Sequence, residues 1–92
     1  MERITAVIKG RVQGVGYRAF LADCAHATGV YGTVRNLPDG TVEMVGESSS
    51  ASLDDFIRMA HARNDPVIRV DEIAVKRCPG TGEFHGFHVA WS

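Results

Sequence analysis

Hydrophobic residues in this chain recur with two different periods, and the order of those periods constrains the fold more than any other feature. Alternation at every second residue, typical of a strand with one buried face, is clearest in RITAVIKGR, residues 3–11. Spacing of three and four residues, typical of an amphipathic helix, follows between Tyr17 and Thr28. The predicted elements in chain order are a strand at 3–11, a helix at 17–28, strands at 30–36 and 41–47, a helix carrying Leu53, Phe56, Ile57 and Ala60, a strand at 67–77 and a short strand at 86–91.

Turn and capping residues separate these elements and indicate how they connect. Gly29 ends the first helix, and the serines within 48–52 supply an N-cap for the second. The PDG turn at 38–40 joins the second and third strands as an antiparallel hairpin. A chain of 92 residues suffices for one core, so we expect a single domain over residues 1–92. The predicted fold is an α+β ferredoxin-like sandwich (βαββαβ), an antiparallel sheet with both helices on one face.

The composition is that of an ordinary globular protein, with 45% apolar residues, 23% charged residues and a net charge of −1. No apolar run approaches the ~18 residues of a membrane span. The acidic start MERITAVIKG lacks the long apolar block of a signal peptide. We therefore expect a cytoplasmic monomer without a membrane or nucleic-acid partner. Reduced thiols at Cys24 and Cys78 are favoured in that compartment, although the sequence leaves a disulfide between them open.

Basic groups are concentrated around a glycine-rich loop. Residues 1–36 hold five basic and two acidic groups, whereas residues 37–92 hold five basic and nine acidic groups. The loop VQGVGY, residues 12–17, joins the first strand to the first helix. Its glycines allow several backbone N–H groups to point at one spot, and the helix N-terminus adds partial positive charge. With the guanidinium of Arg18, the loop is a candidate cradle for phosphate or carboxylate; a tight turn that only requires small residues is the alternative.

Other sites and functions fit the residues less well. GVGYRA at 14–19 matches a dinucleotide fingerprint, but that fold needs parallel strands and an acid at the end of the second strand, where this chain has Asn36. His85 and His88 lie three residues apart on a predicted strand and so point to opposite faces, which disfavours a metal site with Cys78. RNA binding would need aromatic residues on the central strands, and RITAVIKG and TVEMVGE have none. We predict no metal and no cofactor.

Two stretches carry a resemblance to a known family. GRVQGVGYR at 10–18, followed by GTVRNLPDGTVE at 32–43, resembles the acylphosphatase family. The resemblance implies a ferredoxin-like, metal-free hydrolase that cleaves the carboxyl–phosphate bond of small acyl phosphates to a carboxylate and inorganic phosphate. The chain departs from the family pattern at Thr33, where an aromatic residue is usual, and matches only loosely over 58–92. These departures concern the rim of the site and the substrate preference.

The resemblance also implies roles for individual residues. Arg18 is expected to bind the phosphoryl group, and Asn36 to position the attacking water. The expected phosphate-binding loop consists of Gln13, Gly14, Val15, Gly16, Tyr17 and Arg18. Because such a loop recognises the phosphoryl group, inorganic phosphate is expected to inhibit as well as to leave as product. The alternative is a non-catalytic anion-binding module related to the acylphosphatase-like domain of carbamoyl-transfer maturation proteins.

Overall fold

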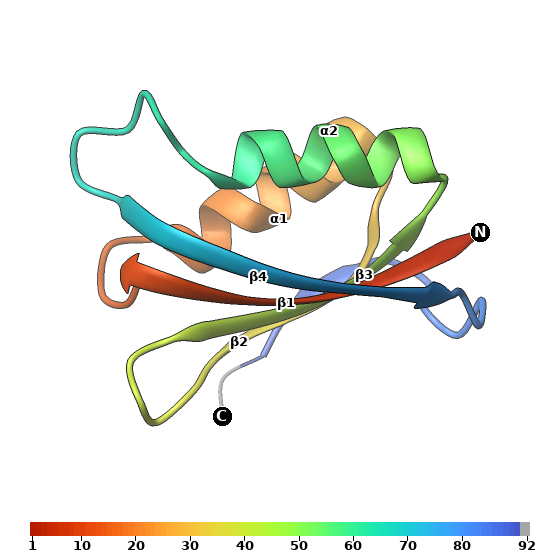
Figure 1. Cartoon of the computed structure of the whole chain (residues 1–92), viewed down its shortest axis with the longest axis horizontal. Coiled ribbons are helices and arrows are strands. Elements are labelled where there is room, and N and C mark those ends of the chain that lie inside the picture. The colour runs from red at the N-terminus through yellow and green to blue at the C-terminus, as the bar shows by residue number, and fades with distance from the viewer. Residues whose placement is uncertain (91–92) are drawn as a thin grey trace.

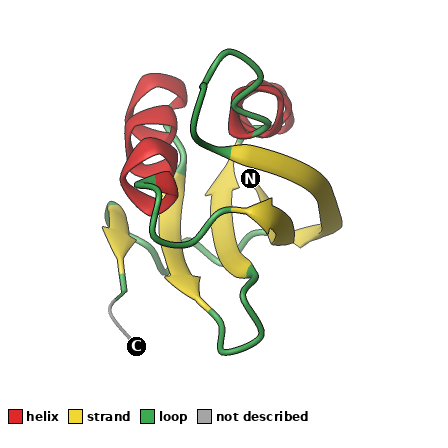
Figure 2. Ribbon diagram, turned by 90° about the vertical axis from the view of Figure 1, so that its left-hand side faces the viewer, coloured by secondary structure: helices red, strands yellow, loops and turns green. Residues whose placement is uncertain are grey.

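The computed structural model describes residues 1–90, in which the strands form one sheet covered on a single face by both helices (Figures 1 and 2). The elements are β1 (Glu2–Arg11), α1 (Tyr17–Thr28), β2 (Tyr31–Asn36), β3 (Val42–Ser48), α2 (Ser50–Ala60), β4 (Arg69–Pro79) and β5 (Phe87–Val89). The strand order is β4-β1-β3-β2-β5. β1 pairs antiparallel with β3 and β4, and β2 pairs antiparallel with β3. The predicted ferredoxin-like sandwich is confirmed.

The last strand differs from the antiparallel sheet that the sequence predicts. β5 pairs in parallel with β2, so the sheet is mixed. The reason lies in where the chain leaves β4: Pro79 pairs with Glu2, at the same end of the sheet where β2 begins. The segment that follows crosses along that end, and β5 must therefore start beside the start of β2 and run in the same direction. The strand predicted at 86–91 spans Phe87–Val89, and Trp91 lies outside the described residues.

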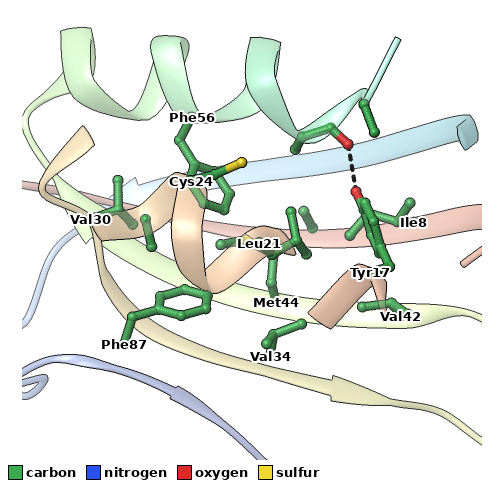
Figure 3. Packing of buried hydrophobic residues seen from close by; sticks show 14 of the residues in the cluster. Ile8, Tyr17, Leu21, Cys24, Val30, Val34, Val42, Met44, Phe56 and Phe87 are labelled. Atoms are coloured by element: carbon green, nitrogen blue, oxygen red, sulfur yellow. Dashed lines mark hydrogen bonds between the residues drawn. The ribbon is translucent and has the colours of Figure 1, made fainter. Parts of the chain in front are cut away.

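The core lies between the helices and the sheet, as Figure 3 shows from close by. The alternation in β1 buries Ile4, Ala6 and Ile8 toward the helices, as the period of two predicts. The largest fully buried side chains include Tyr17, Phe56, Ile4, Ile8, Leu21, Met44 and Leu53. Cys24 and Cys78 are both free thiols, the first buried in this core and the second exposed. Burial raises the pKa of the Cys24 thiol.

The helix ends agree with the residues that the sequence singles out. Gly29 follows α1 in a left-handed conformation (φ 73°), and its N–H donates to the carbonyl of Ala25. Ser49 caps α2, accepting a hydrogen bond from the N–H of Ser52 at 3.2 Å. Among the described residues, no helix has the length and apolar composition to cross a membrane.

Candidate active site

A pocket of about 220 Å³ opens where the end of β1, the start of α1, the end of β2 and β5 meet. Its lining residues are Val12, Gly14, Gly16, Tyr17, Arg18, Ala19, Asn36 and Val89. Sheet topology explains this meeting. β1 and β2 both run antiparallel to β3, so they run in the same direction and end at the same edge of the sheet. The glycine loop after β1 therefore lies near Asn36, the last residue of β2.

The loop backbone has the conformation that its glycines permit. Gly14 (φ 72°) and Gly16 (φ 81°) are both left-handed, and a Cβ at either position would meet no atom within 4 Å. Space is therefore not what requires glycine here; the backbone angle is. Gly16 is the N-cap of α1 and has no side-chain oxygen to accept from the first-turn N–H groups. These groups stand at the pocket, where an anion can accept from them.

Arg18 lies in the first turn of α1 and is held by the residue that follows β5. Its Nη1 donates to the carbonyl of Ala90 at 2.9 Å. The N–H of Ala90 in turn donates to the carbonyl of Val34 in β2 at 2.8 Å. Ala90, directly after β5, thus connects the guanidinium of Arg18 to β2, the strand that carries Asn36. No sequence pattern indicates this contact, because Arg18 and Ala90 are 72 residues apart in the chain.

Asn36 has an unsatisfied acceptor. Among the described residues, its Oδ1 is the buried side-chain polar atom without a hydrogen-bond partner. A buried carbonyl oxygen without a donor costs roughly 1–3 kcal/mol, so its position calls for a physical explanation. Rotation about χ2, which is broad for asparagine, can exchange the places of Oδ1 and Nδ2. The amide can therefore present an acceptor to a donor at the pocket.

Two residues of the predicted loop use their side chains elsewhere. The amide Nε2 of Gln13 donates to the carbonyls of Leu37 and Thr41, each at 2.8 Å. The hydroxyl of Tyr17 donates to the carbonyl of Ala60 at 2.6 Å inside the core, and burial raises the pKa of this hydroxyl. Both residues can therefore offer an anion only their backbone N–H groups.

The other sites considered from the sequence have a different geometry. Among the residues that the structure describes, no three His, Cys, Asp or Glu side chains gather as metal ligands would. β1 and β2 are separated by β3, whereas in a dinucleotide fold the two strands connected through the glycine loop and its helix lie side by side. Asp39 lies roughly as far along the chain from the glycine loop as the acid that binds ribose in a dinucleotide fold. Here its carboxylate instead accepts hydrogen bonds from the N–H and hydroxyl of Thr41.

A larger hollow, of about 490 Å³, lies beside the helices and not at this pocket. It is lined by Phe20, Arg58, Met59, Ala62, Arg63, Asn64 and Asp65. It contains none of the residues predicted to bind phosphate or water. We therefore place the candidate site at the smaller pocket, where a glycine loop, a helix N-terminus, an arginine and an asparagine converge.

Fold and pocket together define a class: a small ferredoxin-like sandwich in which the N-terminus of a helix lies at a pocket of about 220 Å³. A family model described as acylphosphatase matches residues 4–89. An acylphosphatase of Methylococcus capsulatus is 44% identical over 89 residues, which are 97% of this chain and 96% of that protein. The chain therefore belongs to the acylphosphatase family.

Solved structures agree with this assignment. An acylphosphatase from Bacillus subtilis matches with a TM-score of 0.92 and 30% identity, over 99% of this chain and 100% of that one. The HypF protein of T. kodakarensis also matches, with a TM-score of 0.84 and 30% identity. This chain corresponds to only 12% of the HypF chain. The similarity to the Bacillus protein thus extends over both whole chains, whereas in HypF it is confined to one part.

Proposed function

We propose that the protein hydrolyses the carboxyl–phosphate bond of small acyl phosphates, releasing a carboxylate and inorganic phosphate. The observation that carries this proposal is the meeting of Arg18 and Asn36 at one pocket beside the N-terminus of α1. Membership of the acylphosphatase family supports the same reaction.

Binding of the phosphoryl group falls to Arg18 and the backbone of residues 13–18. The guanidinium is a planar, permanently charged donor that matches phosphoryl oxygens, and the first-turn N–H groups of α1 add donors and partial positive charge. In phosphoryl transfer the negative charge spreads over these oxygens, so donors held in place stabilise the transition state. The departing carboxylate has a pKa near 4, so it leaves without a general acid.

Orientation of the attacking water falls to Asn36. An amide oxygen accepts a hydrogen bond but is a poor base, so Asn36 aims the water and does not deprotonate it. The proton then passes to an oxygen of the substrate phosphate. The buried, unsatisfied Oδ1 supports this role, because rotation about χ2 would turn it toward the pocket, where a water would supply the donor that it lacks.

The remaining expectations from the sequence complete the proposal. The chain works as a single-domain cytoplasmic monomer over residues 1–92, without a metal ion, and inorganic phosphate competes with the substrate for the loop. Sedimentation at the assay concentration checks the monomer, and a chelator added during the assay checks the independence from metal.

Replacement of Asn36 by alanine tests the proposal. Because its role is orientation and not charge, Asn36→Ala should lower kcat on the order of 10²-fold or more, while the inhibition constant of inorganic phosphate changes less than about twofold. Asn36→Asp should also weaken phosphate binding, because a carboxylate repels the phosphoryl oxygens. The matched control is Asn64→Ala, an exposed asparagine at the other hollow, which should leave both constants unchanged.

Circular dichroism establishes that each variant is folded. A folded Asn36→Ala variant with the parent's kcat would remove Asn36 from the mechanism. Binding of inorganic phosphate by the parent without hydrolysis of any acyl phosphate would make the chain an anion-binding module instead.

A further inference from the structure

The side chain of Gln13 joins two parts of the candidate site that are distant in sequence. Its Nε2 carries two hydrogens, and each has an acceptor: the carbonyls of Leu37 and Thr41, both at 2.8 Å. The two acceptors belong to the β2–β3 hairpin, where the N–H of Leu37 also donates to the carbonyl of Thr41 at 2.9 Å. One partly buried amide thus closes the hairpin end and ties it to the loop after β1.

The two ends of this connection adjoin the two groups proposed to do the chemistry. Gln13 precedes Gly14, the first left-handed glycine of the phosphate loop, and Leu37 follows Asn36 directly. Gly14 and Gly16 are exposed, with open space where a side chain would stand, and only Val15 between them packs against the core. The Gln13 amide adds two directional contacts from this loop to the hairpin, which the apolar contacts of Val15 with the core do not provide.

We propose that Gln13 is a positioning residue that sets the distance between phosphate held at the loop and water held by Asn36. The proposal rests on the function proposed above, in which Asn36 orients the water. In-line attack depends steeply on that distance, since a displacement of about 1 Å can cost on the order of 10²-fold in rate. Both N–H groups of the amide are already engaged with the hairpin, so Gln13 does not bind phosphate through them.

Two substitutions of similar size remove the connection. Gln13→Met keeps the length of the side chain without donors, and Gln13→Glu places carboxylate oxygens against two carbonyl oxygens. Each should lower kcat about 10- to 100-fold. The inhibition constant of inorganic phosphate should change less than about twofold, because the backbone donors and Arg18 remain. In Gln13→Glu, part of the lost kcat should return below the pKa of the new carboxyl, because its protonated form has one donor.

A double-mutant cycle tests whether Gln13 acts through Asn36. In the Asn36→Ala background, Gln13→Met should lower the residual kcat less than about threefold. The reason is that Asn36 no longer orients the water, so its distance from the phosphate loop no longer matters. Thr28→Val is the stability control: it removes a 2.8 Å hydrogen bond to the carbonyl of Cys24 at the far end of α1. This variant should be less stable to urea but keep the parent's kcat.

The outcomes separate this inference from the proposed function. Two results would overturn the positioning role while Asn36→Ala stays slow. One is a parental kcat in Gln13→Met. The other is a Gln13→Met substitution that lowers kcat as much in the Asn36→Ala background as it does in the parent. Loss of phosphate affinity in step with kcat would make Gln13 a phosphate ligand and also overturn it. A fast Asn36→Ala variant would instead refute the function on which the inference rests.

Discussion

The hydrogen bond between Tyr17 and Ala60 gives a prediction whose size follows from the structure. Tyr17 is the first residue of α1 and is 1% exposed, and Ala60 is the last residue of α2 and is 3% exposed. Their 2.6 Å bond, drawn as a dashed line in Figure 3, pairs a carbonyl at a helix end that has no partner within its own helix. Tyr17→Phe keeps the ring and its packing but leaves this buried carbonyl without a donor. The cost should be about 1–3 kcal/mol of the free energy of unfolding.

Urea denaturation at 25 °C measures this free energy, and the slope with urea should stay that of the parent. In thermal unfolding, the loss corresponds to a fall in Tm of roughly 5–20 °C for a domain of this size. The matched control is Tyr31→Phe, because Tyr31 is 51% exposed, and its effect should stay within about 0.5 kcal/mol. Since the Tyr17 ring lies in the core, the folded variant should keep its kcat. A loss below about 0.5 kcal/mol in Tyr17→Phe would show that the bond does not connect the helices energetically.

Two further predictions concern charged side chains. Arg18→Lys should lower kcat/KM on the order of 10²-fold. The planar guanidinium can donate to Ala90 and to phosphoryl oxygens at the same time, and an ammonium lacks this geometry. Near-parental kcat/KM in the variant would show that the charge alone suffices. The second concerns Glu47, whose pKa burial alone would raise, but hydrogen bonds from the Thr81 N–H and from Arg3 lower it to about 2. The stability contributed by a carboxyl with a lowered pKa is complete above about pH 4.5 and is lost as pH falls toward 2. The urea midpoint of the parent should therefore fall across that range more than that of Glu47→Gln, and parallel curves would contradict the assignment.

Much of the fold could be predicted because its signals are local. The alternation in β1 depends only on neighbouring residues, and the left-handed Gly29 after α1 depends only on the helix that it ends. The position of Arg18 in the first turn of α1 follows equally from the strand, loop and helix around it. Asn36 had no such local signal: an asparagine before a turn is common, and only the resemblance to a family singled it out. The structure shows Asn36 and Arg18 lining one pocket.

The parallel pairing of β5 could not be predicted, because three residues are too few to show a period and the cause lies elsewhere in the chain. Buried Glu47 of β3 accepts hydrogen bonds from the N–H groups of Thr81 and Gly82, at 3.0 and 2.9 Å, and from Arg3. These bonds hold the segment after β4 along the end of the sheet. From there the next strand starts beside the start of β2 and pairs with it in parallel.

The site depends on structure at two scales, and this explains why its residues were easier to predict than its contacts. At the coarse scale, β3 lies between β1 and β2 and runs against both, which brings the glycine loop and Asn36 to the same edge of the sheet. Any sequence with this order of strands would do the same. At the fine scale, the amide of Gln13 connects the loop to the hairpin after Asn36, and the carbonyl of Ala90 holds the guanidinium of Arg18. These contacts join residues far apart in the chain through one or two hydrogen bonds, which leave no hydrophobic period and no turn signal. A sequence pattern therefore indicates which groups meet, whereas the ångström-scale distances on which in-line attack depends are set by contacts that only the folded chain reveals.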